Sequence, residues 1–168
     1  NLDFDTELFR FSYTSMTTPN SIFDFNMKTK ARELLKEEEV LGGYDKTQYE
    51  TKRIYATAMD GTKIPMSIVY KKGMIKDGNN PALLYGYGSY GFTRDPSFSV
   101  ARLPLLDRGF VYAIAHIRGS QINGRQWYED GKLLKKKNTF TDFISCGEFL
   151  IEEGYTTSDN IFAMGGSA

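Results

Sequence analysis

The sequence predicts an α/β fold preceded by a short antiparallel β-meander. Residues 8–35 form short runs that alternate aromatic and polar side chains and are separated by turns, as half-buried antiparallel strands do. Residues 82–164 instead alternate compact apolar strands with segments of helical spacing, which favours parallel pairing. The pattern changes around Gly42 and Gly43, so we expect two units, residues 1–47 and residues 48–168.

The first unit has the pattern of three short strands. Leu8–Thr14 places three aromatic side chains on one face, and a turn is expected at Thr17–Asn20, which contains Pro19. A second run covers Ile22–Met27, and a third lies around residues 34–35. Strands at this spacing suit a β-sandwich or one blade of a β-propeller, and a single blade cannot close a core alone.

The second unit begins with a hairpin and continues as strand, helix and strand. Asp60-Gly61 tolerates the positive φ angles of a tight turn, so the two alternating runs beside it should pair. The runs of the hairpin are Tyr49–Ala58 and Ile64–Tyr70, and the later elements are a strand at Ala82–Tyr85, a helical segment near Leu103–Leu106 and a strand at Phe110–Ile117.

A longer helix is expected from Thr139 to Glu153, with Asn138 as its N-cap and Gly154 as its left-handed stop. The helix should pack on a sheet through one apolar face, which consists of Phe140, Phe143, Ile144, Gly147, Leu150 and Ile151. A short apolar strand, Ile161–Met164, follows it and leads directly into Gly165.

Composition and charge narrow the range of functions. The 21 basic residues balance the 21 acidic ones, and the cluster of Lys132, Lys135, Lys136 and Lys137 is interpreted as a solvated face, so we expect no nucleic-acid partner. No apolar run is long enough to span a membrane. Cys146 is the only cysteine, which excludes an internal disulfide and favours the cytoplasm. The chain starts at Asn1 without a leader pattern, and we interpret it as an internal piece of a longer protein.

The chemistry is expected at the last four residues, Gly165-Gly166-Ser167-Ala168. A strand that runs into Gly-x-Ser-x supplies the first four residues of a nucleophile elbow, in which a serine occupies a strained turn between a strand and a helix. The alternative is an ordinary glycine-rich turn. The preceding helix and strand favour the elbow, because they place Ser167 at the carboxyl end of a parallel strand, where open α/β sheets build their sites.

An elbow of this kind needs an oxyanion hole. One donor would be the backbone N–H of Ala168, and a second would come from the loop after the strand Ala82–Tyr85, where glycines at residues 86, 88 and 91 let the backbone approach a ligand. A glycine-rich turn with core tyrosines is the alternative for this loop. His116, the only histidine, is interpreted as structural, because in this fold class the triad runs serine, acid, histidine along the chain. No metal or cofactor motif is found.

Several ordered motifs resemble the prolyl oligopeptidase family, and within it the oligopeptidase B branch. The motifs span nearly the whole chain and comprise residues 84–91 (LYGYGSYG), 105–111 (LLDRGFV), 115–119 (AHIRG), 124–128 (GRQWY) and 165–168 (GGSA). Ala168 favours the oligopeptidase B branch, because prolyl oligopeptidase itself typically has Asn there. One departure is visible: the family usually shows Arg-Gly-Gly where this chain has Arg118-Gly119-Ser120, which would disturb the loop if positive φ were needed at Ser120.

The resemblance implies a two-domain serine endopeptidase in which a β-propeller caps an α/β-hydrolase domain and admits only short peptides. Residues 1–47 would then be the end of the last blade with its linker, and residues 48–168 the N-terminal part of the catalytic domain, inactive on its own. Family likeness assigns the Tyr87 hydroxyl as the second oxyanion donor, and it places Tyr90 and Asp95 near the substrate.

The same resemblance implies acyl-enzyme formation at Ser167 and cleavage after Arg or Lys. Two alternatives stay open. One is a related peptidase with aminopeptidase or post-proline specificity, and the other is a catalytically inactive homologue that acts as a binding protein. Oligomeric state cannot be deduced from the sequence.

Overall fold

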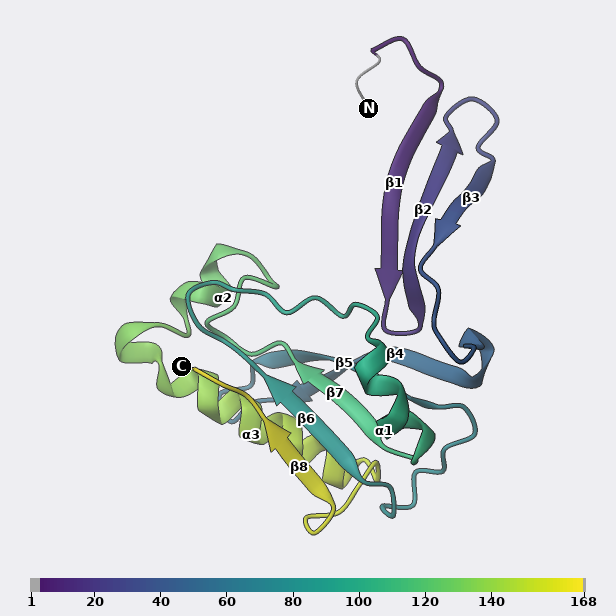
Figure 1. Ribbon diagram of the computed structural model, residues 1–168. Helices are drawn as coiled ribbons and strands as arrows, with labels where there is room; N and C mark the ends of the chain where they lie inside the picture. The colour runs from purple at the N-terminus through teal and green to yellow at the C-terminus, as the bar shows by residue number, and fades with distance from the viewer. Residues whose placement is uncertain (1–3, 168) are drawn as a thin grey trace.

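The computed structural model describes residues 4–167, which form an extended arm and a larger body (Figure 1). The arm is the antiparallel sheet of β1 (Leu8–Ser15), β2 (Thr18–Asn26) and β3 (Arg32–Glu37), in the order β1-β2-β3. This confirms the predicted meander. Rings of the arm stack on one another, since the centroids of Phe11 and Phe23 lie 5.5 Å apart. Most of β1 and all of β3 are nevertheless exposed.

The turn lies about two residues earlier than the predicted turn at Thr17–Asn20. Ser15 pairs with Thr18, so the turn consists of Met16 and Thr17, and Pro19 and Asn20 belong to β2. Proline favours turns, but it is also tolerated at the start of a strand, where its missing N–H is not needed by the ladder.

The body is built on a mixed five-stranded sheet with the order β4-β5-β7-β6-β8. Its first two strands form the predicted antiparallel hairpin, with Gly61 at φ +82° in the turn. β6 pairs in parallel with both β7 and β8, which confirms the strand, helix, strand prediction. The bounds are β4 (Tyr49–Thr57), β5 (Lys63–Lys71), β6 (Ala82–Gly86), β7 (Val111–Ala115) and β8 (Ile161–Met164).

Helices lie on both faces of this sheet, but they cover them unequally. α3 (Lys137–Glu152) covers one face and buries Cys146 and Leu150 against strand side chains such as Leu84. α1 (Leu103–Asp107) covers part of the other face, and α2 (Arg125–Glu129) lies in the loop after β7. Short 3-10 turns occupy Lys46–Gln48, Val100–Arg102 and Leu133–Lys135.

Two details of α3 differ from the prediction. Asn138 is not the N-cap, because the helix begins at Lys137, and the Asn138 Nδ2 instead donates to the carbonyl of Asp130 at 2.9 Å. The predicted apolar face is also rotated, since Phe140 and Ile144 are 56% and 57% exposed. A polar residue, Asp142, points into the core in their place and is 0% exposed. The predicted stop at Gly154 is confirmed by its φ of +72°.

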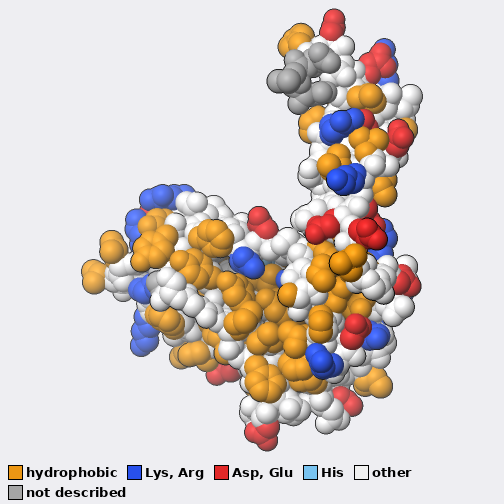
Figure 2. All heavy atoms as spheres, in the orientation of Figure 1, with side chains coloured by type: hydrophobic (Ala, Val, Ile, Leu, Met, Phe, Trp, Pro, Cys, Tyr) orange, Lys and Arg blue, Asp and Glu red, His pale blue; other side chains and the backbone are white. Residues whose placement is uncertain are grey.

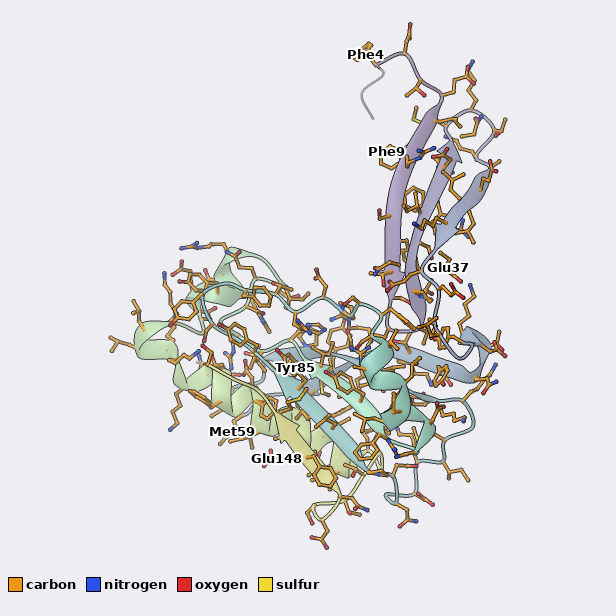
Figure 3. The ribbon with its side chains drawn as sticks, viewed as in Figure 1. Phe4, Phe9, Glu37, Met59, Tyr85 and Glu148 are labelled. Atoms are coloured by element: carbon orange, nitrogen blue, oxygen red, sulfur yellow. The ribbon has the colours of Figure 1, made fainter. Side chains whose placement is uncertain are left out.

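The sheet face that carries α1 remains largely open in this chain. Figure 2 shows hydrophobic side chains gathered across this face, and Figure 3 places Tyr85 of β6 in its middle. Phe162 of β8, paired with Leu83 in the parallel register, is 49% exposed. Within residues 4–167 no helix has the length and apolar character that a membrane crossing requires.

The arm joins the body through the tip of its β1–β2 hairpin. Met16 is 2% exposed and belongs to a core cluster with body residues that include Leu106 and Ile114. Hydrogen bonds support the junction. The backbone N–H of Phe98, in the body, donates to the Thr14 hydroxyl at 3.1 Å, and the Tyr44 hydroxyl, in the linker, donates to the Thr17 carbonyl at 2.9 Å. The two units therefore share one hydrophobic core.

We expect Met16→Ala to destabilise the body by about 2–5 kcal/mol, because it removes a buried side chain and leaves a cavity. Urea unfolding followed by the fluorescence of Trp127, the only tryptophan of the chain, reports on the body alone. The matched control is Met27→Ala in the same arm, where the side chain is 44% exposed. Equal unfolding midpoints for the two variants would contradict a shared core.

Candidate active site

The carboxyl ends of β6 and β8 lie side by side, and both strands run into glycine-rich segments that enclose a pocket of about 360 Å³. Tyr87 lines the pocket from the loop after β6, and Ser167 lines it from the end of β8. Thr139 and Phe143 of α3 form another wall. The structure therefore brings together two of the predicted site residues, which are eighty positions apart in the sequence.

Ser167 has the strained backbone that a nucleophile elbow requires. Its φ is +68°, a left-handed conformation that non-glycine residues rarely adopt and that clusters at functional sites. The side chain is exposed at the pocket. A Cβ at Gly165 would come within 3.0 Å of the Gly86 carbonyl oxygen, so the approach to the serine favours glycine. Ala168, the predicted backbone donor, lies outside the described residues.

Close packing fixes the loop that carries Tyr87. A Cβ at Gly88 would meet Ile117 at 2.6 Å and the Arg118 carbonyl oxygen at 2.8 Å, so this position requires glycine. A Cβ at Gly86 would meet the Phe143 ring at 2.5 Å. The Tyr87 ring packs edge-on against Phe92, with centroids 5.6 Å apart. The tyrosine thus projects from a backbone segment with little room to move.

The segment after β7 lies directly beneath this loop. At Gly119 φ is +100°, and a Cβ there would stand 1.9 Å from the Gly88 carbonyl oxygen. A Cβ at Gly131 would stand 2.1 Å from the Gly119 nitrogen. Thr139, which is buried, donates its hydroxyl to the Arg118 carbonyl at 2.8 Å and ties α3 to the same place. Three chain segments therefore meet at backbone contact distance beside the pocket.

A buried ion pair holds these segments together. The Arg118 guanidinium donates to Asp142 through Nη2 at 2.6 Å and Nε at 2.9 Å, and the Arg118 backbone N–H donates to the same carboxylate at 3.0 Å. Nη1 reaches Asp60 of the β4–β5 hairpin at 2.6 Å. The hydrogen bonds that Arg118 donates to Asp142 are the main cause of its raised pKa, and the guanidinium lowers the pKa of Asp60 to about 2.

Sequence reasoning missed this pair. Asp142 stands among apolar residues of α3, and its spacing from Cys146 and Leu150 puts it on the buried face, which could have indicated a buried carboxylate in need of a partner.

Ser120, the departure from the family pattern, is accommodated without strain. Within residues 4–167 the non-glycine residues with positive φ are Lys30, Tyr90, Leu133 and Ser167, so Ser120 does not need the glycine conformation. Its side chain is buried and donates to the Ile117 carbonyl at 2.9 Å. The loop therefore does not require glycine at position 120.

The two predicted substrate residues do not line the Ser167 pocket. Tyr90 is 79% exposed at φ +57° and lines a neighbouring hollow with Tyr128 and Lys136. Asp95 is exposed further along the same loop. Their contact with a substrate stays a prediction.

His116 lies in the core and does not line the pocket. It is 2% exposed, its Nε2 lies 2.8 Å from the Ser67 hydroxyl, and its carbonyl accepts a hydrogen bond from Trp127 Nε1 at 3.0 Å. Burial, helped by the nearby charge of Arg53, lowers its pKa to about 4. The placement supports the interpretation of His116 as a structural residue.

Because the folded imidazole binds a proton only near pH 4 and an unfolded one near pH 6.5, His116 contributes stability above pH 6.5 that is lost as the pH falls toward 4. As His116 is the only histidine, its ring signals in an NMR titration of the chain are unambiguous. We expect no titration between pH 8 and 5. A midpoint near 6.5 would contradict the buried placement.

Comparison with known proteins agrees with this geometry. Residues 96–168 match the model of the prolyl oligopeptidase family. Over its whole length the chain is 53% identical to dipeptidyl aminopeptidase BI of Pseudoxanthomonas mexicana, and over 98% of its length 44% identical to protease 2 of Moraxella lacunata. The structure of oligopeptidase B from Leishmania major superposes with a TM-score of 0.86 and 47% identity over 98% of this chain.

The resemblance inferred from the motifs is thus confirmed: the chain is homologous to the serine peptidases of the prolyl oligopeptidase family. It spans about a quarter of each of these proteins, namely 23% of the aminopeptidase, 24% of protease 2 and 23% of the Leishmania structure.

Proposed function

We propose that this chain is the nucleophile-bearing part of a serine peptidase that cleaves short peptides. The observation that carries the proposal is the shared pocket of Ser167 and Tyr87, with the serine held at φ +68° at the end of a parallel strand. The left-handed backbone at Ser167 suits a nucleophile that must stand clear of the sheet.

The proposed reaction is acyl transfer. The Ser167 hydroxyl oxygen attacks the peptide carbonyl and loses its proton to a histidine, and the same proton then passes to the leaving amine. The resulting acyl-enzyme is hydrolysed by water. The Tyr87 hydroxyl and the Ala168 backbone N–H donate to the oxyanion. The general base is a histidine other than His116, which is the only one among these 168 residues.

The architecture supports a split into two proposed domains. The order β4-β5-β7-β6-β8, with the first strands antiparallel and the serine after β8, suits the N-terminal part of an α/β-hydrolase sheet at residues 48–168. The separate three-stranded arm suits the end of a propeller blade at residues 1–47. In this proposal the open face seen in Figure 2 is covered by further parts of the catalytic domain.

For specificity we propose cleavage after Arg or Lys, supported by similarity to protease 2 and to oligopeptidase B. Asp95, exposed on the loop that follows Tyr87, is the proposed acidic contact for the basic side chain. The single buried cysteine, Cys146, supports a place in the reducing cytoplasm.

A second candidate is a dipeptidyl aminopeptidase, which releases residues two at a time from a free amino terminus. The 53% identity to dipeptidyl aminopeptidase BI favours it. The two candidates use the same nucleophile and differ in whether a free α-amino group is required.

The full-length protein containing this chain should distinguish them. With chromogenic substrates that end in Arg, an oligopeptidase cleaves the amino-blocked form, whereas a dipeptidyl aminopeptidase cleaves only the unblocked dipeptide. A Pro-linked substrate tests post-proline cleavage. We expect Ser167→Ala to abolish hydrolysis, with a loss of about 10⁶-fold in kcat. Activity that survives in this variant would overturn the peptidase proposal.

Tyr87→Phe should lower kcat by about 100- to 1000-fold with little change in KM, because it removes an oxyanion donor that acts in the transition state. Tyr55→Phe, the same change at an exposed tyrosine of β4 outside the pocket, is the matched control and should leave kcat within about twofold. A kcat for Tyr87→Phe equal to that of the unmodified protein would exclude the oxyanion role.

A further inference from the structure

Lys136 reaches the backbone of the Tyr87 loop from the start of α3. Its Nζ donates to the Gly88 carbonyl at 3.0 Å and to the Ser89 hydroxyl. These acceptors belong to the two residues that directly follow Tyr87 in the chain. Figure 1 shows the first turn of α3 beside the loop that leaves β6.

The neighbouring lysines at positions 132 and 135 make different contacts from Lys136. Lys132 pairs with Glu129 at 2.5 Å and Lys135 with Asp130 at 2.6 Å, both in ion pairs near the surface. Lys136 instead donates to loop oxygens, and its side chain is half-buried. Of the cluster, Lys136 is therefore the lysine in contact with the loop that carries a proposed site residue.

The anchor beneath Lys136 is rigid. Thr139, one turn later on α3, also lies against the Gly88 carbonyl, at 3.4 Å, and Asp142 fixes the helix to Arg118 through the buried ion pair. The Lys136 ammonium group, held by this packing, therefore fixes the position of the loop backbone relative to the pocket. Displacing a catalytic hydrogen-bond donor by about 1 Å can lower the reaction rate by about 100-fold. Contacts that hold this loop in place therefore affect the alignment of the Tyr87 hydroxyl.

We propose that Lys136 is a positioning residue, which clamps the backbone after Tyr87 so that the tyrosine hydroxyl meets the oxyanion. This inference rests on the proposed function, since it assumes that Tyr87 is an oxyanion donor. Lys136 itself does not line the Ser167 pocket and acts through the loop.

The test is a double-mutant cycle in the full-length protein. Lys136→Met keeps the length of the side chain and removes the donor, and Lys135→Met makes the same charge change at an exposed neighbour. We expect Lys136→Met to lower kcat by about 10- to 100-fold with KM within about twofold, and Lys135→Met to leave both unchanged. In a Tyr87→Phe background Lys136→Met should lower kcat by less than about twofold, because the donor it positions is gone.

Ser89→Ala provides a second variant, which removes one acceptor and leaves the lysine in place. We expect a smaller fall in kcat that is likewise absent in the Tyr87→Phe background. Urea midpoints of all variants identify any loss of folding, which a purely structural role would produce equally in both backgrounds.

Each outcome decides the inference. The same fall in kcat with and without the Tyr87 hydroxyl overturns the positioning role while the oxyanion proposal stands, and an unchanged kcat for Lys136→Met does the same. If Tyr87→Phe alone leaves kcat unchanged while Ser167→Ala abolishes activity, the oxyanion proposal fails and the positioning role fails with it.

Discussion

The buried pair of Arg118 and Asp142 is the interaction on which the rest of the site depends. Both side chains are almost completely withdrawn from water, at 7% and 0% exposure, so each charge is tolerated only because the other is present. Removing one partner of such a pair typically costs about 3–5 kcal/mol, because it leaves an uncompensated buried charge. The arginine lies after β7 and the aspartate in the middle of α3, so the pair fixes the helix against the edge of the sheet where the strands end.

Glycines allow the segments held by this ion pair to pack closely enough to form the pocket. Because Gly88, Gly119 and Gly131 have no side chains, three backbone segments approach to contact distance around the arginine. The strand ends that carry Tyr87 and Ser167 are thereby brought to one pocket. A single methyl group at Gly119 would collide with a carbonyl oxygen, which cannot move without displacing the tyrosine loop. The pocket is thus defined by backbone packing before any functional side chain contributes.

Local rules predicted much of this from the sequence. The hairpin at Gly61, the parallel strands and the stop at Gly154 follow from turn chemistry and periodicity. The meeting of Ser167 with the loop after β6 also follows, because the carboxyl ends of neighbouring parallel strands meet, whereas the choice of Tyr87 within that loop came from the family resemblance. The partner of Asp142 did not follow, since helical spacing can place the carboxylate on the buried face but cannot identify an arginine 24 positions away. The same pair explains why Phe140 and Ile144 are turned outward on α3.

The burial of Met16 in the body restricts the rotation of the arm relative to the body. A hinge placed at the glycines of residues 42–43 would have to withdraw the hairpin tip from its socket, which would expose a buried side chain worth about 1.5–3 kcal/mol of transfer free energy. Bending within the arm, above Ser15 and Thr18, avoids that cost. The tip of the hairpin is therefore anchored to the body, although it precedes the linker in the sequence.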